Sequence, residues 1–271
     1  MRKTSQSLAR LLITGGGGFL GRELVARAPA HGWEVRATWR SSRPGLPAEW
    51  LQVDVRDADA MARLARGVDA VIHTAYRQGE DEWSTNVHGS ETVARAAAGA
   101  RLIHLSTDLV FDGRRGRYRE RDATDPVSSY GRSKAEGERR VAAVHPEATI
   151  ARTSLLYGGP EPGPQELLAR RGTRFFVDEI RSPARVGDLA EALLELLPLE
   201  LRGPLHLGGE DDVSRFDFAV ALGADPARIE PAHTTPDRAP DVSLDSSRAR
   251  ALLRTRLRGV YDSSSPVRSA R

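Results

Sequence analysis

Short apolar runs alternate with amphipathic segments through the first 158 residues of the chain. The apolar runs predict six strands, at residues 9–14, 33–39, 49–57, 68–76, 101–107 and 148–158. The intervening segments have helical spacing, at residues 21–32, 57–67, 84–100 and 128–144. Strands that alternate with helices in this way indicate βαβ units. We therefore predict an α/β fold with a doubly wound, parallel sheet of the Rossmann type.

The alternation stops after Tyr157, where a loop rich in glycine and proline begins. A short helix is expected near 166–171 and an amphipathic one at 188–197, with Asp188 as its N-cap. The segments 203–209, 214–223 and 225–240 follow as a smaller, irregular part. The predicted organisation is a dinucleotide-binding Rossmann domain (1–156), a mainly substrate-binding part (157–260) whose helix 188–197 packs back on that domain, and a disordered tail (261–271).

Composition narrows the class of protein. The 271 residues are 39% hydrophobic and 28% charged, as in ordinary globular proteins, and no apolar run is long enough to span a bilayer. The absence of cysteine excludes disulfides and thiolate metal sites. A net charge of +3 does not indicate a nucleic-acid partner. No signal peptide is recognised at the basic N-terminus, so a cytoplasmic location is expected.

A glycine-rich loop, TGGGGFLG, follows the first predicted strand and leads into a helix. Gly15, Gly18 and Gly21 allow a tight turn and a close approach of the backbone to a pyrophosphate, with free N–H groups at the helix start. Phe19 and Leu20 complete the loop on the same site. The motif predicts dinucleotide binding; the alternative is a simple glycine-rich turn.

The end of the second strand indicates which dinucleotide binds. NAD sites usually carry an acidic residue there, whereas this chain has Arg40 and Arg43, which would receive a 2′-phosphate. NADPH (or NADP⁺) is therefore the expected cofactor. Asp54 and Val55 follow the third strand and are predicted to line the adenine pocket; they could equally form an ordinary turn.

Tyr130 and Lys134 lie four residues apart at the start of a predicted helix, so both project from one face. Lys134 is one of two lysines in a chain that otherwise uses arginine. An ammonium near a phenol lowers the pKa of the phenol, which favours proton transfer near neutral pH. Thr107 ends the fifth strand, where its hydroxyl can hydrogen-bond a substrate oxygen.

These motifs, with LSTDLVFDG, YGRSKAEGE and ARTSLLYG, resemble the extended short-chain dehydrogenase/reductases, in the branch of dTDP-4-dehydrorhamnose reductase type. The resemblance covers about residues 9–253, including DEIRSPARVGDLAEALLELL and GPLHLGGEDDVSRFDFA. It implies a catalytic triad of Thr107, Tyr130 and Lys134, and cofactor contacts from the loop glycines, from Ala75, and from Tyr130 and Lys134 themselves. On the substrate side it implies Asp108, Leu109, Leu155 and Asn86.

Two positions depart from that branch. Leu109 stands where a tyrosine is usual, and Leu155 where a tryptophan is usual, both toward the sugar-nucleotide site. No equivalent of acidic residues that some relatives use with Mg²⁺ is evident, and the histidines lack metal-ligand spacing. We expect no metal site.

The resemblance implies an NADPH-dependent ketoreductase, acting on a nucleotide-linked 4-keto-deoxysugar with Tyr130 as general acid. One alternative is a reductase of another ketone, such as an antibiotic intermediate. Another is a non-catalytic NADP-binding regulatory subunit, because the β subunit of methionine adenosyltransferase resembles the same branch. The arginine-rich segment 114–121 is interpreted as a solvated loop or as a border of the substrate entrance, and helices near 84–99 and 130–144 are candidate homodimer faces.

Overall fold

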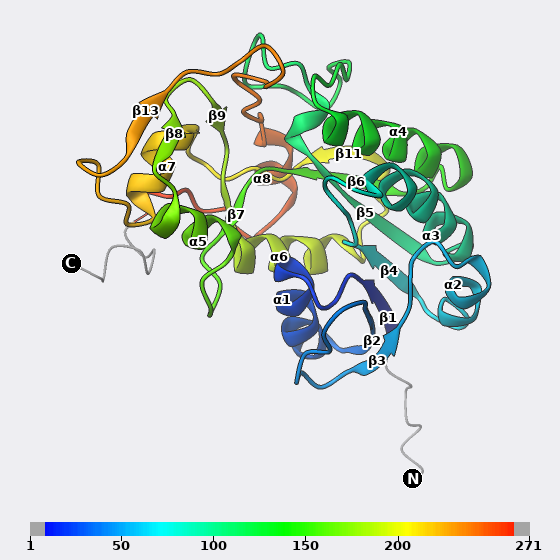
Figure 1. Ribbon diagram of the computed structural model, residues 1–271. Coiled ribbons are helices and arrows are strands. Elements are labelled where there is room, and N and C mark those ends of the chain that lie inside the picture. Colours follow the sequence, from blue (N-terminus) through cyan, green and yellow to red (C-terminus); the bar gives the residue numbers. More distant parts are fainter. Residues whose placement is uncertain (1–8, 263–271) are drawn as a thin grey trace.

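The computed structural model describes residues 9–262, and a seven-stranded parallel sheet runs through its centre (Figure 1). The strand order is β11-β6-β5-β4-β1-β2-β3. The strands are β1 (Ala9–Thr14), β2 (Trp33–Trp39), β3 (Glu49–Gln52), β4 (Ala70–His73), β5 (Arg101–Thr107), β6 (Thr149–Thr153) and β11 (Gly203–His206). The predicted doubly wound α/β fold is confirmed.

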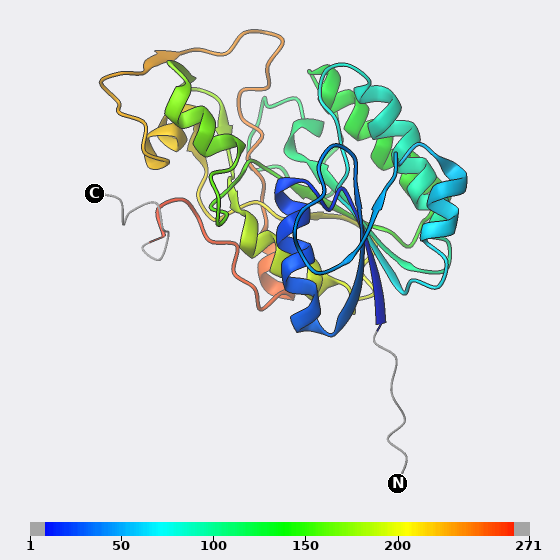
Figure 2. The same ribbon diagram turned by 60° about the horizontal axis from the view of Figure 1, so that its bottom comes forward.

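Helices cover both faces of this sheet (Figures 1 and 2). One face packs on α1 (Phe19–Arg27) and α6 (Val186–Leu196), and the other on α2 (Ala58–Leu64), α3 (Ser90–Ala96) and α4 (Ser129–Val144). Successive strand residues point to opposite faces, so Leu11 and Ile13 join the first core and Leu12 joins the second. Burial on both faces explains why these strands are apolar runs in the sequence.

The order in which strands are added to the sheet reverses at β1, which pairs with β2 on one side and with β4 on the other. Ligands of open parallel sheets bind beyond the carboxyl ends of the strands at such a switch point. The glycine loop leaves β1 at this edge, and the residues that follow β4 and β5 reach the same edge. The topology therefore brings the predicted site segments together.

A smaller C-terminal part lies to one side of the sheet (Figure 2). Short strands pair in it as β7 (Leu156–Tyr157) with β10 (Ala184–Arg185), β9 (Ile180–Arg181) with β12 (Val213–Ser214), and β8 (Arg174–Phe176) with β13 (Glu230–Ala232). Its helices are α5 (Pro164–Arg171), α7 (Arg215–Ala221) and α8 (Ser247–Leu252). Phe175 and Ala219 belong to a core cluster separate from those of the sheet.

Several local predictions differ from the structure. Residues 203–206, expected in the smaller part, form β11 at the edge of the main sheet beside β6. The helix at 188–197 begins at Val186, and the Asp188 side chain accepts from the Arg258 guanidinium instead of capping it. Residues 84–100 divide into a π-helix, η2 (Ser84–Gly89), and α3. The predicted disordered tail lies outside the described residues beyond position 262.

Candidate active site

Two adjoining cavities open at the carboxyl edge of the sheet. The first, here called the glycine-loop cavity, has a volume of about 290 Å³, and the second, the Tyr130 cavity, about 210 Å³. Both are lined by Gly15, Gly18, Thr74 and Tyr76. Because the two cavities share these lining residues, ligands bound in the two cavities would lie next to each other.

Backbone packing shapes the glycine-loop cavity. Gly15 has a φ of +72°, and a Cβ there would lie 2.7 Å from the backbone nitrogen of Ala75, after β4. A Cβ at Gly21 would lie 2.2 Å from the carbonyl oxygen of Gly15. The Gly18 N-cap provides no side-chain hydrogen bond to the first turn of α1, which also lacks acidic residues. The loop therefore presents a helix start suited to an anion.

The residues after β2 form the far wall of this cavity. Arg40 lines it with Trp39, Ser41 and Ser42, and within residues 9–262 its guanidinium makes no ion pair. Arg43 is exposed and is not among the lining residues, so the structure brings one of the two predicted arginines to the site.

Asp54 and Val55 line the same cavity, as predicted. The Arg56 side chain hydrogen-bonds the Asp54 carboxylate and lowers its pKa, with Arg40 acting in the same direction. Phe19 and Leu20 line the neighbouring Tyr130 cavity, whereas Ala75 lines the glycine-loop cavity.

The Tyr130 cavity contains all three predicted catalytic residues, Thr107, Tyr130 and Lys134. Ser128 caps α4 by accepting a hydrogen bond of 3.0 Å from the Gly131 N–H, and this cap fixes where the helix starts. The helix then carries Tyr130 and Lys134 on one face, toward the residue that ends β5.

Burial governs the electrostatics of the pair. Lys134 is 3% exposed, its Nζ donates a 2.7 Å hydrogen bond to the Leu105 carbonyl, and burial lowers its pKa to about 8. Burial, with the neighbouring Tyr76 and Asp108, raises the pKa of Tyr130. The prediction of a lowered tyrosine pKa is therefore wrong for the ligand-free protein. Tyr130 retains its proton near neutral pH and can act as a proton donor.

Thr107 is held by its neighbours. Its Oγ1 donates to Asp108 Oδ1 at 3.0 Å and accepts from the Leu109 N–H at 3.3 Å. Ser154 Oγ donates to the other Asp108 oxygen at 2.5 Å. Burial raises the pKa of Asp108, and Arg181 opposes this shift. Asp108 thus orients the Thr107 hydroxyl inside the cavity.

Of the predicted substrate residues, some line the Tyr130 cavity and one does not. Leu109 and Leu155 line the Tyr130 cavity, as does Asp108. Asn86 does not line either cavity: its side-chain amide bonds the backbone N–H and carbonyl of Arg77, each at 2.8 Å, and Ser133 Oγ at 2.9 Å. Asn86 braces the segment after β4 against α4, and its hydrogen-bonding groups are used in doing so.

The lining residues that were not predicted from the sequence include Tyr76, Gln78, Gln165 and Arg181. Tyr76 is 56% exposed, and its ring centroid lies 6.0 Å from that of Tyr130. Its position at the end of an expected strand could have indicated it. Gln165 and Arg181 come from the irregular C-terminal part, where no local pattern marks a site.

The arginine-rich segment 114–121 does not line either cavity. Its side chains pair with acidic residues instead, Arg115 with Asp122, and Arg117 and Arg119 with two aspartates of the C-terminal part. Within residues 9–262 there is no group of three metal-ligating side chains. No helix in that range is long and apolar enough to cross a membrane.

Comparison with known proteins places this geometry in a family. Residues 9–258 match the model described as RmlD substrate binding domain. The chain belongs to this family. A relative from Mycobacterium tuberculosis (strain ATCC 25618 / H37Rv), dTDP-4-dehydrorhamnose reductase, is 40% identical over 82% of this chain and 78% of its own length.

Two further proteins are similar to this chain. Methionine adenosyltransferase 2 subunit beta from Danio rerio is 29% identical over 84% of this chain and 76% of its own length. A crystal structure of dTDP-4-dehydrorhamnose reductase from Bacillus anthracis str. Ames in complex with NADP has a TM-score of 0.78 at 24% identity, covering 93% of this chain and 96% of that one. The last comparison supports the fold.

Proposed function

We propose that this protein is an NADPH-dependent ketoreductase that acts on a nucleotide-linked 4-keto-deoxysugar. The observation that carries the proposal is the meeting of Thr107, Tyr130 and Lys134 in a cavity that shares a wall with the glycine-loop cavity. This arrangement would place a ketone in the Tyr130 cavity beside the nicotinamide end of a cofactor. The relatives named as dTDP-4-dehydrorhamnose reductases support the substrate class.

The glycine-loop cavity fits a phosphorylated dinucleotide. Its floor is a backbone turn in which a side chain at Gly15 or Gly21 would collide with neighbouring backbone, and its far wall carries Arg40, which makes no ion pair within residues 9–262. We assign the pyrophosphate to the loop and the 2′-phosphate to Arg40, with Asp54, Val55 and Ala75 as further wall. When bound, NADPH supplies the hydride that reduces the ketone.

The protein residues manage the proton and the carbonyl oxygen. The raised pKa of Tyr130 keeps its hydroxyl protonated, so it can donate a proton to the oxygen as negative charge develops there. The Thr107 hydroxyl, which donates to Asp108 in the ligand-free protein, would turn from that carboxylate to donate to the same oxygen. The buried cation of Lys134 stabilises negative charge that reaches Tyr130.

A regulatory subunit is the second candidate, because methionine adenosyltransferase 2 subunit beta is a relative. A purely regulatory role would require a bound cofactor but would not require a proton donor beside Thr107 and Lys134. The complete set in one cavity therefore favours chemistry. Reduction of a different ketone would use the same set, with a pocket shaped by Leu109 and Leu155.

The test is NADPH oxidation by the purified protein against a panel of dTDP- and UDP-linked 4-keto-sugars and matched ketones without a nucleotide. We expect turnover with at least one nucleotide-linked ketone and little with the unlinked set. Turnover confined to unlinked ketones would assign the second type of reductase. Tight NADPH binding without oxidation by any ketone would favour the regulatory role.

A further inference from the structure

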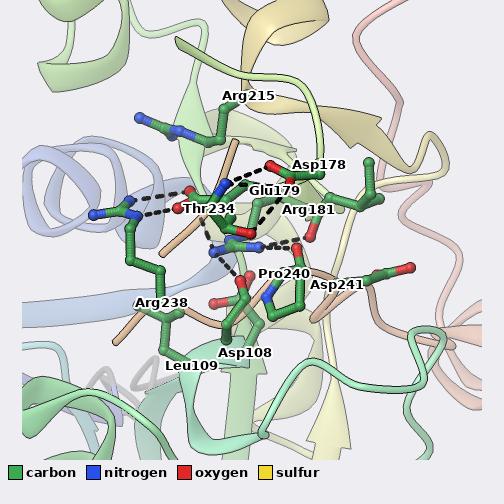
Figure 3. A network of polar contacts seen from close by, with 12 residues as sticks. Asp108, Leu109, Asp178, Glu179, Arg181, Arg215, Thr234, Arg238, Pro240 and Asp241 are labelled. Carbon is green, nitrogen blue, oxygen red and sulfur yellow. Dashed lines mark hydrogen bonds and ion pairs between the residues drawn. The ribbon is translucent and has the colours of Figure 1, made fainter. Parts of the chain in front are cut away.

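Three arginines from separate segments of the C-terminal part surround one buried glutamate near the Tyr130 cavity (Figure 3). Arg181 belongs to β9 and lines the cavity, Arg215 is the first residue of α7, and Arg238 lies in the loop after β13. Glu179, which is 1% exposed, pairs with Arg238 and lies 3.5 Å from Arg181. The cluster therefore contains more cations than this carboxylate can neutralise.

Arg215 is the cation of the cluster on which the nearby carboxylates, Glu179 first, act only at a distance. Within residues 9–262 it makes no ion pair, and in Figure 3 its guanidinium lies apart from the Glu179 carboxylate. Asp108 also acts on Arg215 electrostatically, but Thr107 and Ser154 already bond that carboxyl group. Burial lowers the pKa of Arg215 to about 10, with Arg181 adding to the shift, so the side chain remains charged at neutral pH.

Arg215 orients the residue between itself and the cavity. Its Nη1 donates a 2.8 Å hydrogen bond to Oε1 of Gln165, a lining residue of the Tyr130 cavity. A guanidinium has donors but no acceptor, so the amide oxygen of Gln165 must face Arg215. The amide NH₂ group is then directed away from Arg215 and is available as a donor to a ligand.

Arg181 contributes a fixed charge to the same wall. Its guanidinium donates to the backbone carbonyls of Ile180 (2.8 Å), Pro240 (3.1 Å) and Ala239 (3.0 Å). These bonds hold the cation in place and use its donors on the protein. The wall thus combines amide donors from Gln165 with two nearby positive charges, one of them without an ion pair within residues 9–262, a combination suited to a polyvalent oxyanion.

We infer that Gln165, Arg181 and Arg215 form a subsite for the phosphate groups of the nucleotide-linked substrate. The inference rests on the proposed function and adds which residues of the C-terminal part hold the charged portion of that substrate. A partly buried cation without an ion pair is costly, and a bound diphosphate would supply negative charge beside it. Gln165 and Arg181 line the Tyr130 cavity, whereas Arg40, at the assigned 2′-phosphate position, lines the glycine-loop cavity.

The experiment is calorimetric titration of the NADPH-saturated protein with thymidine diphosphate and, separately, with thymidine. Saturation with NADPH keeps the diphosphate out of the glycine-loop cavity. The variants are Arg215→Met, which removes the cation, and Gln165→Glu, which offers Arg215 a carboxylate and repels phosphate without emptying the wall. Arg228→Met is the matched control, because Arg228 is exposed and pairs with Asp225 away from either cavity.

We expect the Kd for thymidine diphosphate to rise about tenfold to a hundredfold in Arg215→Met and in Gln165→Glu, as for loss of a charged hydrogen bond. The Kd for thymidine, the Kd for NADPH and the Arg228→Met control should be unchanged. Equal affinity for the diphosphate in the parent and both variants would overturn the subsite, as would a parent that binds thymidine equally well. Binding through Arg215 without NADPH oxidation by any ketone would refute the reductase and leave the subsite standing.

Discussion

The glycine-loop cavity and the Tyr130 cavity meet at one edge of the sheet, but the chain constructs them differently. The first is formed by the glycine turn after β1 and by the short segments that follow β2, β3 and β4. The second is formed by side chains from α4, β9 and α5, among others, which are far apart in sequence. The glycine turn leaves no room for a side chain at Gly15 or Gly21, whereas the side chains of the second cavity can be substituted one at a time.

This contrast implies that changes in the Tyr130 cavity should affect chemistry and spare cofactor binding. The largest effect is expected for Tyr130→Phe, which removes the proton donor and little volume. Turnover should fall about 10²–10⁴-fold, the usual contribution of general acid catalysis. Single-turnover NADPH oxidation, with the NADPH Kd measured beside it, checks this; unchanged turnover would show that another group donates the proton.

At Arg40 we expect the opposite result, a loss of cofactor affinity. Arg40→Asp should weaken NADPH binding by about tenfold or more, because a charged hydrogen bond is replaced by repulsion of the 2′-phosphate. NADH lacks that phosphate, so its affinity should change far less. Arg43→Asp is the matched control, since Arg43 is exposed and does not line the cavity. Equal losses for both cofactors in Arg40→Asp would remove the assignment.

The pH dependence of activity tests whether the positive charge of Lys134 is needed for the reaction. Burial lowers its pKa to about 8, so the ammonium is charged below that pH and neutral above it. If the cation is needed, kcat/KM for NADPH, which reports the ligand-free protein, should fall about tenfold per pH unit above pH 8. Tyr130, with its raised pKa, should stay protonated throughout this range. A profile that is flat to pH 9.5 would show that the Lys134 charge is dispensable.

Much of this architecture could be predicted from the sequence because the strands are buried on both faces. The bounds of β2 and β5 match the predicted runs, whereas the short edge strand β11 contains Gly203 and Pro204 and gives no such signal. Residues that belong to one contiguous motif, such as Tyr130 and Lys134, lie in the same cavity, as their spacing predicted.

Side chains placed by tertiary packing could not be predicted in the same way. Asn86 was expected at the substrate but is used as a brace, because its hydrogen-bond partners come from the segment after β4 and from α4. Arg181 and Gln165 reach the cavity through the irregular C-terminal part, where the sequence shows no periodic pattern. The pKa of Tyr130 depends on burial, which the spacing to Lys134 does not reveal.

The smallest expected effect concerns the two leucines of the Tyr130 cavity. An aromatic ring stacks on a sugar or base and a leucine does not, so Leu109 and Leu155 should bind part of the substrate differently from aromatic residues. We expect Leu155→Trp to change KM for dTDP-4-dehydrorhamnose by a few-fold and to leave the NADPH Kd unchanged. Efficient use of that substrate by the unmodified protein would contradict an altered pocket.

The most direct test of the central claim follows the hydride itself. NADPH deuterated at the reactive carbon of the nicotinamide, in each of its two stereochemical forms, would be incubated with the nucleotide-linked ketone that gives turnover. One form should place a single deuterium on the former carbonyl carbon for each NADPH consumed, as measured by mass spectrometry and NMR. NADPH consumption without deuterium in the product from either form would contradict hydride transfer between the two cavities.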